Sequence, residues 1–249
     1  MRCSGSRIVL AVLVGIAALP LASQSPAFEV ASIRLSEDEH SPSIAPILRN
    51  GRLTAHRATL RQILSRACEL TEPQVIGPEW LDKVRFDIVA RAPAGAPDSA
   101  MAPMLRALLE ERFKLAAHLE TRTVPVYHLT VAPGGVKMPL YPAHSPVAND
   151  PAVRGSATMG GASTPARIAK HLSFILDKPV IDKTGLTDRY SYFAFFTPVS
   201  SQPGADVSEF RAPDIFTAIQ KQLGLKLDSA RDAVSLLIVD RIEKSPSEN

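Results

Sequence analysis

Apolar residues along this chain recur with two different spacings, which predict strands and helices in turn. FEVASIRL (28–35) alternates and predicts a strand, and RLTAHRA (52–58) predicts another after a polar loop that proline interrupts. From 60 to 68 the apolar positions follow helical spacing, and Thr59 is placed to cap that helix. RFDIVARA (85–92) alternates again, so this first helix is followed by a strand.

The order of helix and then strand-like runs recurs in three later rounds. Apolar stripes predict helices that begin near Ala100, at Pro165 and after Pro213. We expect the strands behind these helices to pair as hairpins: 115–124 with 125–132, 179–182 with 190–196, and 224–228 with 234–239. The last run, VSLLIV, is nearly all apolar, which predicts a strand buried on both faces inside a sheet.

Two of the rounds align at a constant offset of 110 residues, with apolar residues meeting apolar residues. Examples are Leu105 with Ile215, Phe113 with Leu223, and Val126 with Leu236. An internal duplication and a chance match between two amphipathic segments both account for this alignment. In either case the fold class is α+β, with repeated helix-plus-β-hairpin units that form antiparallel sheets covered by helices.

Composition shifts divide the chain into five predicted segments. Residues 132–164 are rich in Pro, Gly, Ala and Ser, which indicates a long loop or linker between two halves. The predicted segments are a signal peptide (1–24), an N-terminal α+β half (25–135), the loop or linker (136–164), a C-terminal α+β half (165–244) and a disordered tail (245–249).

The first segment has the order of a secretory signal peptide: basic, apolar, then small residues. Arg2 and Arg7 precede the apolar run 8–22, and we expect cleavage between Ala22 and Ser25. The run is shorter than the roughly 20 residues that span a bilayer, although an uncleaved anchor is the alternative. The sequence therefore predicts a secreted or periplasmic protein without a membrane span after cleavage.

Removing the signal peptide changes the charge and the cysteine count. Residues 1–24 hold two arginines and no acid, so the net charge falls from +3 to +1. No clustered basic run follows, and nucleic acid is therefore not an expected partner. Cys68 is the one cysteine left, which rules out an intramolecular disulfide in the processed chain.

The tetrapeptide Asp182-Lys183-Thr184-Gly185 spells the site that is phosphorylated in cation-pumping ATPases. Such a pump needs ATP-binding modules and many membrane helices, neither of which this sequence contains. The structural alternative is a strand end at 180–182 followed by a turn, in which Gly185 takes positive φ. Asp182 and Arg189 could pair across the hairpin, and we expect a structural role for the motif.

No other motif predicts a catalytic, cofactor-binding or metal-binding residue. His118 and His128 would face each other across a hairpin centred on Thr123, but no third metal ligand is evident. Cys68 lies on the apolar stripe of a helix without a neighbouring base, which predicts a buried structural thiol. The single tryptophan, Trp80, is expected to pack a turn onto a helix rather than line a groove.

An ordered series of motifs extends over nearly the whole processed chain. It consists of FEVASIRL, GRLTAHRATLRQIL, IGPEWLDKVRFDIVARA, MLRALLEERFKLAAHLETRTVPVYHLTVAPGG, KPVIDKTGLTDRY and IFTAIQKQLGLKLDSARDAVSLLIVDRIEK. This series resembles a large family of uncharacterised secreted proteins expanded in soil acidobacteria, which is known as a domain of unknown function. The resemblance implies export and a helix-plus-hairpin architecture, and it carries over no catalytic residue. Asp188, where the family pattern leads us to expect glycine, is one departure from it.

Two functions from different classes follow from these observations. The favoured one is a non-catalytic binding or interaction module of the cell envelope or extracellular space, without a cofactor, whose candidate partner is another envelope or secreted protein. Strand edges would serve such a module for β-augmentation. The alternative is a secreted hydrolase whose site assembles from residues distant in sequence. A pocket with convergent polar groups would favour the hydrolase, and an exposed edge or apolar groove would favour the module.

Overall fold

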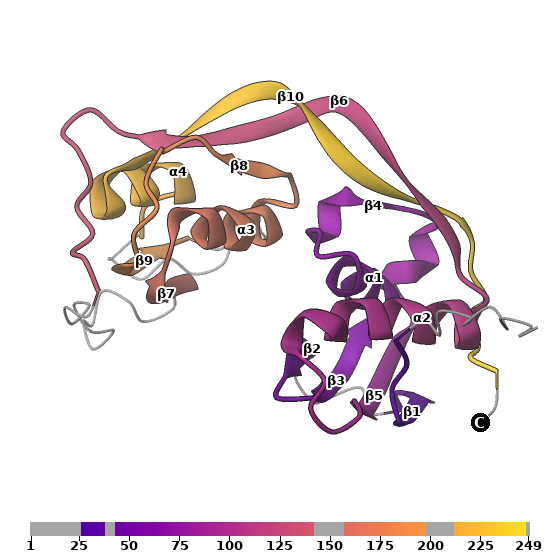
Figure 1. The fold of residues 1–249 in the computed structure, drawn as a ribbon. Coiled ribbons are helices and arrows are strands. Elements are labelled where there is room, and N and C mark those ends of the chain that lie inside the picture. The colour runs from indigo at the N-terminus through magenta and orange to yellow at the C-terminus, as the bar shows by residue number, and fades with distance from the viewer. Residues whose placement is uncertain (1–25, 38–42, 142–156, 198–211, 248–249) are drawn as a thin grey trace, which may run out of the picture.

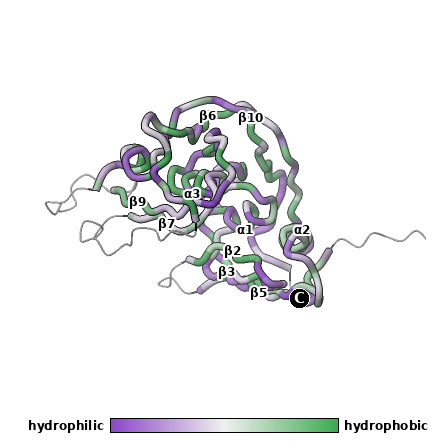
Figure 2. Tube along the Cα trace, turned by 60° about the vertical axis from the view of Figure 1, so that its left-hand side comes forward, coloured by the Kyte–Doolittle hydropathy of each residue, from purple (hydrophilic) through white to green (hydrophobic). Residues whose placement is uncertain are grey.

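The computed structural model describes residues 26–37, 43–141, 157–197 and 212–247. They form two lobes, which are joined by a long two-stranded ribbon that arches from one lobe to the other (Figure 1). The turned view in Figure 2 shows the same ribbon bending over α3 and α1. Mixed helices and antiparallel sheets confirm the α+β class.

Lobe 1 consists of a four-stranded antiparallel sheet with two helices on one face. The sheet has the order β1-β5-β3-β2, and the lobe also contains the short strand β4. Its elements are β1 (Val30–Leu35), β2 (Ile44–Arg49), β3 (Arg52–Thr59), α1 (Leu60–Ala67), β4 (Val75–Ile76), β5 (Arg85–Arg91) and α2 (Met101–Phe113), with 3-10 turns at Glu72–Gln74, Glu79–Asp82 and Asp98–Ala100.

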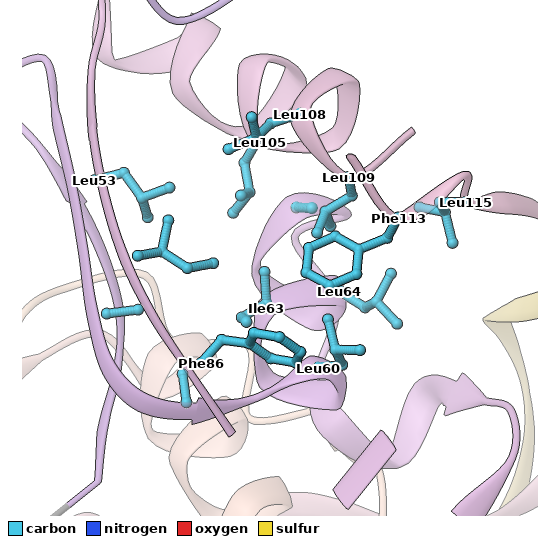
Figure 3. Close-up of a cluster of buried hydrophobic side chains, with 14 of the residues drawn as sticks. Leu53, Leu60, Ile63, Leu64, Phe86, Leu105, Leu108, Leu109, Phe113 and Leu115 are labelled. Carbon is cyan, nitrogen blue, oxygen red and sulfur yellow. The ribbon is translucent and has the colours of Figure 1, made fainter. Parts of the chain in front are cut away.

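The core of lobe 1 lies between this sheet and the two helices (Figure 3). Phe86 from the sheet and Phe113 from α2 meet edge to face, with ring centroids 5.1 Å apart. As the sequence predicts, Thr59 caps α1: its hydroxyl accepts a hydrogen bond from the backbone N–H of Gln62 at 3.2 Å. The local pattern of residues 52–113 therefore specifies this core.

Lobe 2 has a smaller sheet and a separate core. Antiparallel β7 and β9 form the sheet, and α3, α4 and the π-turn after α4 pack against it. The elements are β7 (Ala157–Ser163), α3 (Pro165–Leu176), β8 (Val180–Asp182), β9 (Tyr190–Phe196), α4 (Ile215–Ala218) and the π-turn Ile219–Leu223.

The ribbon that joins the lobes is made of two continuous strands, β6 (Ala116–Val131) and β10 (Leu225–Arg241). They pair antiparallel along their length, from Leu225 opposite Val131 to Val239 opposite Ala117. Strand β4 adds to β10 at Leu237 and Ile238, and β8 adds to β6, both in parallel. The apolar VSLLIV run thus lies inside a sheet where β4, β10 and β6 meet, as its composition predicts.

The face of the ribbon that is buried changes between its ends and its centre. Leu227 and Leu129, which are partners in the ladder, are buried in the core of lobe 2, and Leu237 is buried in the core of lobe 1. At the centre the opposite side is buried, where Val234 and Leu236 form a small cluster with Val126. Because successive side chains in a strand point to opposite faces, this change requires a strongly twisted ribbon.

The two halves of the ribbon are related by an approximate twofold arrangement that follows the offset of 110. Thr123 lies opposite Ala233, its own counterpart at this offset, so the centre of the ladder maps onto itself. Tyr127 carries β8 and its counterpart Leu237 carries β4. The helical segment before each long strand ends in a residue of left-handed conformation. These residues are Lys114 after α2, with φ 51°, and its counterpart Gly224 before β10, with φ 70°. Each long strand therefore begins in one lobe and ends in the other.

The three predicted hairpins do not form. The runs 115–124 and 125–132 are one strand, as are 224–228 and 234–239, and each pairs with the other strand. Pro125 imitates a turn signal, but it lies on the strand whose outer edge has no partner at this position within the described residues, where proline is tolerated. Strand β8 pairs with β6, while β9 pairs with β7.

Two strands fall in segments that the sequence predicts as loops. Strand β2 lies in the polar stretch before residue 52, and β7 lies at the end of the predicted linker, part of which (142–156) is outside the described residues. The β2–β3 turn is Asn50-Gly51 with φ of 52° and 68°, the positive values that a two-residue hairpin turn requires. That dipeptide is a hairpin signal that was available in the sequence. No helix of the described chain is long and apolar enough to span a bilayer.

A truncation tests how far the fold depends on β10. Removing residues 234–249 takes Leu237 from the core of lobe 1 and Val234 and Leu236 from the central cluster. Each buried side chain stabilises the fold by about 1.5–3 kcal/mol, against a total stability of about 5–15 kcal/mol. We expect calorimetry to show no cooperative unfolding transition.

The matched control removes only residues 245–249. Within these, the N–H of Ser247 donates to the carbonyl of Arg112 at 2.8 Å, a contact at the surface end of α2. Its loss should cost about 0.5–1.5 kcal/mol and leave the transition cooperative. A normal transition in the longer truncation would contradict the role assigned to β10.

Candidate functional site

A cleft of about 250 Å³ lies between the lobes beneath the centre of the ribbon. Lobe 1 contributes Thr71 and Gln74, and α3 and β8 of lobe 2 contribute most of the remaining wall. The apolar part of the lining includes Ile181 of β8 and Val234 of the ribbon. The polar residues of the lining are Thr71, Gln74, Lys170, Ser173 and Asp182, so the cleft combines apolar walls with several polar positions, as ligand sites commonly do.

Helix α3 presents one face to the cleft. Ala166, Ala169, Lys170 and Ser173 are spaced by three and four residues, which places them on one side of a helix. The hydroxyl of Ser173 donates to the carbonyl of Ala169 at 2.9 Å and accepts from the N–H of Val180 at 2.8 Å. This buried hydroxyl joins the end of α3 to β8 and is committed to those structural bonds.

Asp182 reaches the cleft from the motif that resembles a phosphorylation site. Its Oδ1 accepts hydrogen bonds from the N–H of Thr184 at 2.9 Å and from the Thr184 hydroxyl at 2.7 Å. The same hydroxyl accepts from the N–H of Leu186, and Gly185 has φ of 72°. These bonds build a tight turn at the end of β8, in which Gly185 takes the positive φ that the sequence predicts.

The predicted ion pair between Asp182 and Arg189 is not formed. The Arg189 guanidinium lies 4.7 Å from the ring centroid of Tyr141 and donates to the carbonyl of Ala162 at 3.3 Å. The prediction assumed that β8 and β9 form a hairpin. Since the two strands pair with different neighbours, Arg189 is directed toward β7 instead.

Two acidic residues lie near each other where the lobes meet beside the cleft. Glu72 belongs to the turn of lobe 1 that carries Thr71 and Gln74, and Asp177 ends α3 in lobe 2. Burial is the main cause that raises the pKa of Glu72, and the charges of Asp82 and Asp177 add to it. The side chain of Gln62 hydrogen-bonds to Glu72 and opposes the shift. Burial, and to a smaller extent the neighbouring carboxylates, therefore disfavour the charged form of Glu72.

A polar cluster lies along the ribbon near β8. Asp232 accepts hydrogen bonds from the N–H of Ala233 at 2.8 Å and contacts His128 Nε2 at 3.1 Å and Lys183 Nζ at 3.3 Å. The N–H of Ala233, followed by His128, lowers the pKa of Asp232. At the other end of the ribbon, His118 Nδ1 lies 2.8 Å from Asp240. Within the described chain, neither imidazole hydrogen-bonds to a serine, threonine or cysteine side chain, so no nucleophile accompanies them.

The predicted opposition of His118 and His128 is wrong. Both lie on β6, ten residues apart along one continuous strand, which separates them by roughly 30 Å. They cannot bind the same ion. In the part of the chain that the structure describes, no group of three or more His, Cys, Asp or Glu residues is arranged to hold a metal.

Comparison with known proteins identifies the family. A model of the family described as "Protein of unknown function (DUF3738)" matches residues 61–242, which is more than half of the chain. The chain belongs to the DUF3738 family. No curated protein and no solved structure matches it. The matched range includes every residue that lines the interlobe cleft.

The two other residues that the sequence of this DUF3738 chain singles out, Cys68 and Trp80, both pack against the lobe 1 core. Cys68 caps the end of α1 and packs against the lobe 1 core, and burial raises the pKa of its thiol. Trp80 packs against the same core from the turn before β5, with Lys244 Nζ 5.5 Å from its ring centroid. The cleft residues Gln74, Lys170 and Asp182 were not predicted as a group, because nothing in the local sequence links three segments so far apart.

The raised pKa of Glu72 predicts a pH-dependent gain in stability for Glu72→Gln. A carboxyl group with a folded pKa above its unfolded value stabilises the fold fully below the unfolded pKa, and this stability is lost as the pH rises through the folded pKa. Glutamine cannot ionise. We therefore expect Glu72→Gln to raise the melting temperature at pH 7, with the gain shrinking as the pH approaches about 4.

Glu79→Gln is the matched control, since that side chain is 92% exposed on the next turn of the same lobe. Thermal melts of both variants from pH 4 to pH 8 check the expectation. An equal gain at every pH, or the same gain in Glu79→Gln, would show that the surroundings of Glu72 do not disfavour its charge.

Proposed function

We propose that this DUF3738 protein is a non-catalytic binding module of the cell envelope or extracellular space, and that its cleft holds an apolar group of a protein partner. The observation that carries this proposal is the cleft itself, to which both lobes and the centre of the ribbon contribute. Its volume of about 250 Å³ lies just below the range of about 300–1,000 Å³ for whole small-molecule sites. It therefore suits a side chain or short apolar segment of a larger partner.

The polar positions of the cleft are suited to orienting such a segment. Gln74 uses both ends of its amide within the protein: its Nε2 donates to the carbonyl of Ser235 at 2.9 Å, and its Oε1 accepts from the N–H and the hydroxyl of Thr71 at 3.0 and 2.8 Å. The charged side chains are therefore the groups that would orient a bound segment. The ammonium group of Lys170 and the carboxylate of Asp182 place both signs of charge in the wall. A peptide backbone, with donors and acceptors beside an apolar side chain, matches this combination.

The hydrolase alternative has weaker support in the geometry. His128 with Asp232 resembles the oriented base of a hydrolytic site, because a carboxylate fixes the imidazole. However, both hydroxyl residues of the cleft are engaged elsewhere: the Ser173 hydroxyl bonds to Ala169 and Val180, and the Thr71 hydroxyl donates to Gln74 Oε1 at 2.8 Å. Binding is therefore the function that the arrangement favours.

Filling the cleft tests the binding proposal. Ala166 is exposed on α3 and lines the cleft, so Ala166→Trp should occupy the cleft without disturbing a core. Anilinonaphthalene sulfonate, an apolar anion, is the probe. We expect saturable binding to the wild type with a fluorescence increase, and at least about tenfold weaker binding to Ala166→Trp, equivalent to about 1.4 kcal/mol.

The control adds the same indole ring one residue further along. Arg167 is exposed on α3 and does not line the cleft, so Arg167→Trp should bind the probe as the wild type does. Equal binding of the probe by all three proteins would show that the probe does not bind in the cleft. Hydrolysis of nitrophenyl esters that His128→Gln abolishes would favour the hydrolase instead.

The proposed location makes a separate prediction about the amino terminus. The basic, apolar and small residues at its start are the support for export. We expect protein expressed with its complete sequence in a Gram-negative host to appear outside the cytoplasm with a new amino terminus between Ala22 and Ser25. Amino-terminal sequencing that still finds Met1 or Arg2 in the exported fraction would contradict it.

A further inference from the structure

The outer face of the lobe 1 sheet carries a row of three arginines. Arg49 lies opposite Arg52 in the β2–β3 pair, and Arg52 lies opposite Arg91 in the β3–β5 pair. Residues opposite each other in antiparallel strands share a face, so the three side chains lie on one face of the sheet. The neighbouring residues Leu53 and Ala90 point to the helix-covered core, which leaves the arginines on the uncovered face.

This row carries unfavourable charge repulsion that nothing nearby relieves fully. Adjacent strands are about 4.8 Å apart, and like charges directly opposite each other destabilise a sheet. None of the three arginines forms a salt bridge or side-chain hydrogen bond with another residue in the described ranges. Folding alone therefore gives no reason for three guanidinium groups to stand side by side.

A cavity of about 360 Å³ opens beside the row. Arg52 and Arg91 line it together with the Asn50-Gly51 turn and the segment 93–96. Its walls are fixed by backbone hydrogen bonds, including the N–H of Ala92 to the carbonyl of Gly51 at 2.8 Å. Glu29 supplies the one carboxylate in the lining. Two arginines and one glutamate among the lining residues, with Arg49 next in the row, leave an excess of positive charge.

We propose that this cavity binds a phosphate group of a ligand, with Arg52 and Arg91 as its ligating residues and Arg49 as a third positive charge. The guanidinium fork forms paired hydrogen bonds with oxyanions, which a lysine ammonium group cannot do. A single carboxylate satisfies one such fork. A phosphate group, with three oxygens and up to two negative charges, matches two forks that neighbouring strands supply at one cavity.

The positive residues on this face are arginines rather than lysines, which supports specific recognition of a phosphate group over general attraction to anions. The outer face also carries Arg34 on β1, and the one lysine in the first hundred residues, Lys83, lies outside these four strands. Attraction to any anion needs charge alone, which lysine supplies equally well. This site lies in lobe 1 alone and is separate from the interlobe cleft, so it does not depend on the function proposed for the cleft.

Titration calorimetry with inorganic pyrophosphate tests the site. The ionic strength is low and is held constant with a chloride salt. We expect saturable binding with one pyrophosphate per chain, weakened at least about tenfold by Arg52→Gln or Arg91→Gln, which each remove a charged hydrogen-bonding fork. Glu29→Gln should tighten binding several-fold, because it removes the opposing carboxylate. Without the probe, Arg52→Gln should not lower the melting temperature, since it relieves repulsion.

Arg34→Gln is the matched control, because it removes the same charge from the same sheet face beyond the cavity lining. It should change pyrophosphate affinity less than about twofold, since an exposed charge outside the site is screened by salt. The Arg52 and Arg91 variants should still bind the cleft probe like the wild type, which separates this site from the cleft. No saturable pyrophosphate binding by the wild type, or equal weakening by Arg34→Gln, would overturn the proposal.

Sedimentation with vesicles distinguishes the source of the phosphate. Binding to phosphatidylglycerol vesicles, but not to phosphatidylcholine vesicles, that pyrophosphate displaces would assign the site to a lipid headgroup. Pyrophosphate binding without sedimentation would assign it to a soluble phosphoester. Vesicle binding that pyrophosphate does not displace, and that Arg52→Gln leaves unchanged, would count against the site.

Discussion

The antiparallel ladder between β6 and β10 is the interaction on which both lobes depend. Each lobe packs side chains from both strands against its core: Ala117 and Leu237 in lobe 1, and Leu129 and Leu225 in lobe 2. The strands β4 and β8 also complete their pairing on the strand that begins in the opposite lobe. Neither half of the chain can therefore bury its own apolar surface fully without the other half.

The twist of the ladder also creates the cleft. At its centre the exposed side carries polar or small residues such as Thr123 and Arg231, while Val126, Val234 and Leu236 are buried on the opposite side. The polar residues at the centre are expected where a strand crosses between lobes with one face in water. An apolar strip is thus held above the junction of the lobes, where α3 and the turn at Glu72–Gln74 form the walls.

The sequence predicts local elements well and their pairing poorly. Strand β1, the Thr59 cap and the apolar faces of α1 and α2 depend on neighbouring residues, and all are present. The continuity of β6 through Arg122–Pro125 depends on a partner more than a hundred residues away, so a local pattern suggested a turn. The row of Arg49, Arg52 and Arg91 likewise could not be predicted without knowing the register of three strands. The cleft could not be predicted because three distant segments form it. By contrast, Asn50-Gly51 was a local signal that could have located β2.

The contact between the lobes is weaker than the ladder that holds them together. It brings Glu72 toward Asp177, two groups of like charge, and includes one hydrogen bond from Gln74 to Ser235. A ligand in the cleft would touch both walls and would favour the arrangement that binds it. At a hundred times its dissociation constant such a ligand stabilises the bound form by about 2.7 kcal/mol, which exceeds the net worth of a typical hydrogen bond, about 0.5–1.5 kcal/mol. The ladder thus sets where the lobes lie, and occupancy of the cleft would decide how firmly they close on each other.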